Sequence, residues 1–127
     1  MIDINTIIRM ESSGRSDAVS PKGAIGLMGI MPIALKDWNN SHPGDKITKE
    51  KLKDEDTNIM VGTWYINERI PELLAEKGIA PSIEAVLSAY NMGAEALSQH
   101  IKGNRDFPEE TRDYLIKYRM GGDVAAG

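Results

Sequence analysis

The 127 residues include no cysteine, so disulfide bonds and thiol chemistry are excluded and packing alone must hold the fold. No apolar run approaches the ~20 residues that a membrane-spanning helix needs. The N-terminus also lacks the basic region and apolar core of a secretory signal. With 15 Lys and Arg against 19 Asp and Glu, the net charge of −4 offers no electrostatic footprint for nucleic acid. We therefore expect no membrane span and no nucleic-acid partner.

Signals for β-structure and for repeats are also missing. The chain has no internal repeat, no heptad seam and no Asn-Gly turn between alternating apolar runs, which predicts a mainly α protein. Its hydrophobic content of 41% is sufficient for one sizeable core. We expect one domain over residues 1–120 and a disordered tail at 121–127.

Helical spacing begins close to the N-terminus. Asp3 is a candidate N-cap, and Ile4, Ile7 and Ile8 follow at the i, i+3, i+4 spacing of one buried helix face. A long helix is expected to contain residues 59–70, where Pro71 should kink or restart it before a stop at Gly78.

The C-terminal half predicts three more helices. One begins after Ser82 as N-cap and ends near residues 91–93, and a short one covers about 94–102. Asp106 and Glu109 resemble a capping box for a last helix that carries Tyr114, Leu115 and Tyr118.

Glycine and proline interrupt the pattern between residues 12 and 32. This segment predicts a loop, a short glycine-rich helix with Gly23, Gly26 and Gly29 on one side, and another turn. Such glycines let another backbone approach closely, or let a sugar reach exposed carbonyls. Residues 39–56 are polar and predict an exposed connection with one short helix.

Glu11 is the most informative candidate for chemistry. It continues the buried stripe of the first helix, where desolvation would raise the pKa of its carboxyl and let it donate a proton near neutral pH. The alternative is a helix-end carboxylate that turns outward or caps Ser12 and Ser13. Spacing alone favours this structural alternative, because structural carboxylates outnumber catalytic ones.

Other polar and aromatic residues carry weaker signals. Tyr90 and Asn91 join an apolar helix face to a glycine turn, where a tyrosine hydroxyl binds a ligand or is satisfied within the core. His42 and His100 are isolated and read as surface residues, so no metal site is expected. Trp38 and Trp64 either flank a sugar site or are simply buried.

Several ordered motifs resemble a known family. They are Glu11-Ser12-Ser13, the run from Ala18 to Met28 (AVSPKGAIGLM), Ile30-Met31-Pro32, Asn58-Ile59 with Gly62, Ala89-Tyr90-Asn91 with Gly93, and Glu110-Thr111-Arg112 with Tyr114. Together they resemble the soluble lytic transglycosylase (SLT) catalytic domain of the lysozyme superfamily, over nearly the whole chain. The resemblance implies a single lysozyme-like (goose-type/SLT) helical domain.

The resemblance also implies a reaction. Glu11 would protonate the glycosidic oxygen between N-acetylmuramic acid and N-acetylglucosamine in peptidoglycan, and would then act as base toward the muramyl 6-hydroxyl to give a 1,6-anhydro sugar. Tyr90 would orient Glu11, and Ser20 would contact substrate. Met28 and Asn91 complete the residues expected to bind or orient substrate, and Gly29, Ile30 and Glu110 are weaker candidates. No metal or cofactor is implied, and we expect a monomer whose partner is the glycan strand.

One departure from the family concerns Gly29, which stands where the family usually has a glutamine that hydrogen-bonds substrate. Losing that contact should weaken sugar positioning by about 1–3 kcal/mol unless another group replaces it. Two alternatives stay open: a hydrolytic lysozyme that uses the same acid, and a non-catalytic glycan-binding or assembly module. The expected place of action is the periplasm or cell wall, for a protein that is phage-borne, separately exported or a shortened piece of a longer one.

Overall fold

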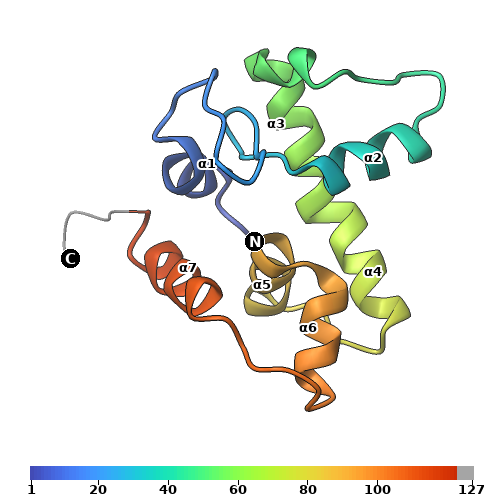
Figure 1. Cartoon of the computed structure of the whole chain (residues 1–127), viewed down its shortest axis with the longest axis vertical. Helices are drawn as coiled ribbons and strands as arrows, with labels where there is room; N and C mark the ends of the chain where they lie inside the picture. Colours follow the sequence, from blue (N-terminus) through green and yellow to red (C-terminus); the bar gives the residue numbers. More distant parts are fainter. Residues whose placement is uncertain (123–127) are drawn as a thin grey trace. The chain divides into compact units, whose positions relative to one another are not determined.

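A computed structural model of the chain describes residues 1–122, and within that range it is mostly helical, with isolated β-bridges in place of strands (Figure 1). The predicted mainly α class is therefore confirmed. Internal contacts divide the chain into two compact units: Ile4–Tyr65 forms one, here called the N-unit, and Met1–Asp3 with the chain from Ile66 onward forms the other, here called the C-unit. No helix within residues 1–122 is long and apolar enough to cross a bilayer.

The N-unit contains α1 (Ile4–Ser12), α2 (Pro32–Ser41), the 3-10 turn η1 (Glu50–Lys53) and α3 (Glu55–Trp64). The predicted first helix is confirmed, and Ile7 on its inner face is fully buried. α3 packs against α2 and η1. The buried apolar side chains of the unit include Ile7, Ile25, Leu27, Met28, Ile30, Leu35, Trp38, Leu52 and Val61.

α2 was not predicted from the sequence. Pro32 was expected to lie in a turn, whereas it opens the helix at its first positions. Proline is well suited to that place, because its ring presets a helical φ and the missing N–H has no partner there in any helix.

The short glycine-rich helix predicted between residues 12 and 32 is wrong. Gly23, Gly26 and Gly29 have φ values of 90°, 79° and 62°, which no right-handed helix contains. The segment instead folds into turns joined by antiparallel bridges from Ile25 to Val19 and to Ile30. The glycines serve those turns and do not line one side of a helix.

α3 continues through a π-helical turn, η2 (Tyr65–Arg69), into α4 (Ile70–Glu76). Pro71 lies at the start of α4, so the restart predicted at this proline is confirmed. A proline removes one helical N–H and crowds the preceding turn, and the widened π turn lies where that crowding falls. Gly78, with φ 72°, then follows the helix end as predicted.

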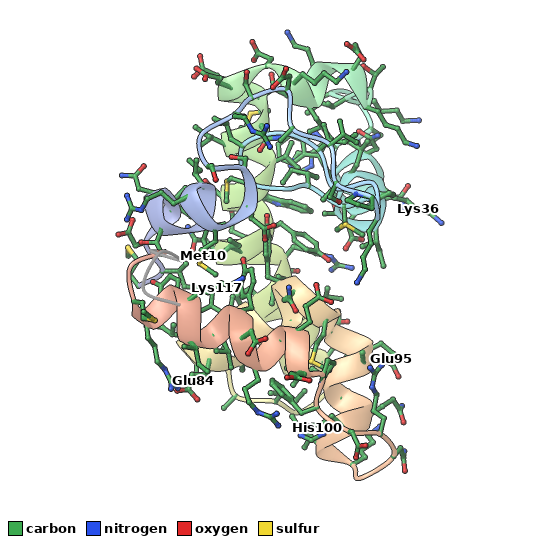
Figure 2. All side chains as sticks on the ribbon, turned by 60° about the vertical axis from the view of Figure 1, so that its left-hand side comes forward. Met10, Lys36, Glu84, Glu95, His100 and Lys117 are labelled. Carbon is green, nitrogen blue, oxygen red and sulfur yellow. The ribbon has the colours of Figure 1, made fainter. Side chains whose placement is uncertain are left out.

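The C-unit is built around α5 (Ile83–Met92), which packs against α4, α6 (Ala94–Ile101) and α7 (Glu109–Arg119). The Ser82 cap is confirmed, because its hydroxyl accepts a hydrogen bond of 3.1 Å from the amide of Ala85. Figure 2 shows Glu84 and Glu95 on these helices: Glu84 pairs with Arg119 of α7, and Glu95 accepts a 2.6 Å bond from Lys77. The core of the unit consists of Ile66, Ile70, Leu74, Val86, Leu87, Ala89, Leu97 and Tyr114.

The predicted capping box at Asp106 is wrong, although the last helix is present. The N-cap is Pro108, and no side chain caps it. A residue before proline is disfavoured in helical conformation, so Phe107 cannot serve as the first helical residue and the helix begins after the proline.

The ends of the chain and the two histidines complete the description. The amide of Asp3 donates to the Tyr118 hydroxyl at 2.8 Å, within the C-unit. Gly121 and Gly122 form the turn that closes α7; the rest of the predicted tail, residues 123–127, lies outside the described residues. His42 and His100 are half-buried, contrary to the prediction that both are surface residues, because each ring lies against an aromatic neighbour.

Candidate active site

Glu11 lies in the last turn of α1 and is half-buried. The adjoining Ser12 closes the helix: its hydroxyl donates to the carbonyl of Ile8 at 3.1 Å and accepts from the amide of Gly14 at 3.2 Å. Ser13 follows with a positive φ of 55°. The chain therefore leaves the helix sharply, directly after the glutamate.

The Glu11 side chain lies against the backbone of Gly29. A β-carbon placed on Gly29 would be 2.7 Å from Oε1 of Glu11 and 3.1 Å from both its Cβ and its Cδ. Real carbon atoms do not approach an oxygen that closely, so only glycine leaves this space open. The glutamate and the glycine turn, 18 positions apart in sequence, thus meet within the N-unit.

The turn that carries Gly29 is closed by paired hydrogen bonds. The amide of Ile25 donates to the carbonyl of Ile30 at 3.0 Å, and Ile30 returns the bond at 2.9 Å. Within the turn, the Gly29 amide donates to the carbonyl of Gly26 at 3.1 Å. Residues 25–30 are therefore a small hairpin that presents the glycine to Glu11.

Asn58 of α3 anchors this hairpin from below the surface. Its side chain is fully buried, accepts a 2.8 Å bond from the amide of Met28, and donates to the carbonyls of Ile25 at 2.9 Å and Leu52 at 2.8 Å. Gly26 lies so close that a β-carbon there would overlap the Asn58 amide. One asparagine thus satisfies three backbone groups of two separate segments.

Asn58 belongs to one of the motifs of the family resemblance, but no role was predicted for it. A signal was available: an asparagine directly before Ile59, the first apolar position of the expected helix, needs hydrogen-bond partners once it is buried. The sequence could not show which backbone groups those partners are.

The remaining N-unit candidates are placed as follows. Met28 is fully buried and packs on Gly62 of α3, where a β-carbon would meet its sulfur. Ile30 is 1% exposed and pairs with Ile25. Ser20 is exposed, and its hydroxyl accepts a 3.0 Å bond from the amide of Ala24. Met28 and Ile30 shape the hairpin through packing, while Ser20 lies in the turn before it.

Tyr90, Asn91 and Glu110 belong to the C-unit. Tyr90 and Asn91 are half-buried in the last turn of α5. The side-chain oxygen of Asn91, Oδ1, accepts a 2.8 Å hydrogen bond from the hydroxyl of Thr111. Thr111 is 1% exposed and belongs to the first turn of α7. This bond links two of the predicted motifs. The expected role of Tyr90 in orienting Glu11 stays a prediction.

An aromatic cluster fills the other side of the N-unit. Trp38 is 4% exposed and stacks on His42 with ring centroids 3.7 Å apart, while Trp64 meets Trp38 edge to face at 5.3 Å. The Trp38 indole N–H donates to the carbonyl of Asp45 at 3.1 Å. Of the two roles considered for the tryptophans, burial describes Trp38. Within residues 1–122, no three side chains of the metal-binding types gather to hold an ion.

The chain is thus a mainly helical protein in which a half-buried glutamate, Glu11, lies against a glycine hairpin. The sequence profile of the transglycosylase SLT domain matches residues 3–112. The chain therefore belongs to the transglycosylase SLT domain family, a family of enzymes that cleave glycosidic bonds. The match includes every predicted site residue from Glu11 to Glu110.

A curated relative agrees with this assignment. The membrane-bound lytic murein transglycosylase E of Buchnera aphidicola subsp. Acyrthosiphon pisum (strain APS) is 31% identical over 104 residues. The aligned region covers 80% of this chain and 47% of the relative. The chain thus spans about half the length of the curated relative that it matches.

Proposed function

We propose that this chain is a peptidoglycan lytic transglycosylase, which cleaves the β-1,4 bond between N-acetylmuramic acid and N-acetylglucosamine with Glu11 as general acid and base. The observation that carries the proposal is the packing of the Glu11 carboxylate against Gly29, in a hairpin that Asn58 anchors. A general acid contributes only when it is held at a fixed place relative to the bond that breaks. Family membership and the murein transglycosylase relative support the substrate class.

The proposed reaction uses one carboxyl group twice. The Glu11 carboxylic acid gives its proton to the glycosidic oxygen as the bond to the muramyl C1 breaks, and the leaving sugar keeps that proton as its 4-hydroxyl. The resulting carboxylate removes the proton of the muramyl 6-hydroxyl, whose oxygen then bonds to C1. Water is not consumed, and Glu11 is restored to its acid form. Backbone carbonyls or the substrate acetamido group would stabilise the positive charge at C1.

The remaining predicted residues are proposed to serve this step. Ser20 is exposed in the segment before the hairpin and is proposed to contact a sugar or peptide. Tyr90 is proposed to orient Glu11, and Asn91, whose side-chain oxygen accepts a bond from the Thr111 hydroxyl, is proposed to bind or orient substrate. The enzyme is proposed to act as a monomer on glycan strands of the periplasm or cell wall.

The test is digestion of purified peptidoglycan by the wild type and by Glu11→Gln, with the released muropeptides identified by mass spectrometry. Glutamine keeps the size of the side chain but cannot donate and recover the proton, so we expect a loss of at least ~10²-fold in product formation. Glu76→Gln is the control, because it removes an exposed carboxylate from α4. Circular dichroism and thermal melting would show whether both variants fold.

The products decide between the alternatives. Anhydro-muropeptides that disappear in Glu11→Gln support the proposal. Reducing-end products heavier by one water indicate a hydrolytic lysozyme that uses the same acid. Binding of glycan without any product from the wild type indicates a non-catalytic module and overturns the proposal.

A further inference from the structure

We propose that Gly29 is a positioning residue for Glu11: the missing side chain at position 29 is what allows the carboxylate to take its place on the hairpin. The inference rests on the proposed function of Glu11 and concerns how this chain holds that group. It also gives a meaning to the glycine that replaces the glutamine usual in the family. In this chain the position holds the acid in place instead of contacting the sugar.

Two independent features of Gly29 support the inference. Its φ of 62° is a left-handed conformation that side chains disfavour. In addition, an added β-carbon would lie 2.7 Å from Oε1 of Glu11 and 3.1 Å from Cδ. Several other glycines also have a positive φ. Among the glycines described, Gly29 is the one at which an added β-carbon would meet Glu11.

The effect of a side chain at position 29 depends on which of its neighbouring atoms can move away. The nearest atom to the added carbon is Oε1 at the end of the Glu11 side chain, which moves when that side chain rotates, whereas the Glu11 Cβ at 3.1 Å is fixed to α1 and can give way only by a small shift of the helix. The hairpin backbone cannot yield as easily, because Asn58 and the Ile25–Ile30 pair hold it. A side chain at position 29 therefore displaces the carboxylate, with a small shift of α1 against the hairpin.

Two other glycines, Gly26 and Gly78, show that the contact with Glu11 is specific to Gly29. A β-carbon added at Gly26 would overlap the Asn58 amide and would lie 2.6 Å from the carbonyl oxygen of Leu52. A side chain there would therefore disrupt the bonds that anchor the hairpin. Gly78 has a similar φ of 72°, and an added β-carbon there meets nothing within 4 Å. Alanine at position 78 thus reproduces the backbone strain without the contact, and serves as the matched control.

The experiment compares Gly29→Ala with Gly78→Ala in the full chain. We expect similar falls in Tm for the two variants, but a loss in kcat of about 10²-fold for Gly29→Ala alone, with little change in KM, because misplacing a catalytic group by about 1 Å has that effect. The Glu11 carboxyl carbon is followed by NMR titration, with Glu11→Gln used for assignment. Its titration midpoint should change in Gly29→Ala and stay in place in Gly78→Ala.

A second variant separates strain from contact. Asparagine tolerates the left-handed conformation better than alanine and carries the same β-carbon. Gly29→Asn should therefore melt closer to the wild type than Gly29→Ala does, and still lose the same activity. Gly29→Gln should also lower kcat, although it restores the family's usual residue.

The outcomes distinguish this inference from the proposed function. A wild-type titration midpoint in both Gly29→Ala and Gly29→Asn overturns the positioning role, whether or not the wild type cleaves glycan. Full activity or a gain of activity in Gly29→Gln overturns it as well. A shifted midpoint in a protein whose wild type shows no cleavage supports the positioning role and counts against the proposed enzyme.

Discussion

Glu11 takes its place through three residues that play no part in the proposed chemistry. Ser12 closes α1 with its hydroxyl, and Gly29 leaves room for the carboxylate. Asn58 supplies the rigidity by holding the hairpin from α3. From the sequence, Glu11 was the candidate acid and Gly29 was only the loss of a polar contact, because the use of a missing side chain shows only when the neighbour that fills its space is known.

The Asn58 side chain allows a prediction at the same scale. Asn58→Ala removes the bonds that Asn58 makes to the Met28 amide and the Leu52 carbonyl, and each such buried group costs about 1–3 kcal/mol, while the Ile25 carbonyl keeps its bond from the Ile30 amide. We expect the free energy of unfolding to fall by about 3 kcal/mol or more, as measured by urea denaturation. Asn40→Ala, on the exposed side of α2, should change it by less than about 0.5 kcal/mol. Equal losses in the two variants would contradict the anchoring role.

The helices and the glycine hairpin differ in how far they follow local rules. Ser82, Pro71 and Gly78 all act where their chemistry predicts, because caps and breaks depend on neighbours within one helical turn. The segment from residue 12 to 32 does not, since its glycine spacing also fits one side of a helix. Its positive φ values and bridges depend on Asn58, which lies 28 or more residues further along the chain.

The N-cap of α3 gives a prediction for pH. Asp54 accepts hydrogen bonds from the Thr57 hydroxyl at 2.7 Å and from its amide at 3.1 Å, and these bonds lower the pKa of the Asp54 carboxyl. A carboxyl with a lowered native pKa stabilises the fold above its unfolded pKa, and this stabilisation is lost as the pH falls through the native pKa. The Tm difference between wild type and Asp54→Asn should therefore be full above about pH 4 and shrink at lower pH.

Asp56→Asn is the control for this measurement, because it removes the same charge from the exposed first turn of the same helix. Comparing the two variants across the acid range separates the capping bonds from the charge alone. A Tm difference for Asp54→Asn that stays constant from neutral to strongly acid pH would show that the bonds to Thr57 carry no pH-dependent stability.

At the scale of the whole molecule, the chain enters and leaves the N-unit through helices. The C-unit takes its residues from both ends of the chain, as the bond from Asp3 to Tyr118 shows. One connection leads straight into α1, and the other passes through the continuous helical stretch of α3, η2 and α4. Unfolding either unit alone would break that helical stretch, so we expect the chain to unfold cooperatively, in keeping with the predicted single domain of residues 1–120.

Both tryptophans lie in the N-unit, so their fluorescence reports on that unit. Leu74→Ala removes a fully buried side chain from the C-unit and should cost about 2–5 kcal/mol. Cooperative unfolding requires the urea midpoint of tryptophan fluorescence to fall together with that of circular dichroism. An unchanged fluorescence midpoint in Leu74→Ala would show instead that the two units unfold independently.

The sequence alone determined the mainly α class, most helix starts and stops, and the family, because each rests on local spacing or on ordered motifs. It also offered Glu11 as a candidate acid: the apolar helix stripe singled the residue out, and the family resemblance implied its role. Only the tertiary structure decided three other features: the helix that begins at Pro32, the conformation of the glycine hairpin, and the hydrogen bonds by which Asn58 anchors it. The contact of Glu11 with Gly29 belongs with them: a hydrogen bond or a vacant space between segments distant in sequence has no local pattern, and exists only once packing brings the segments together.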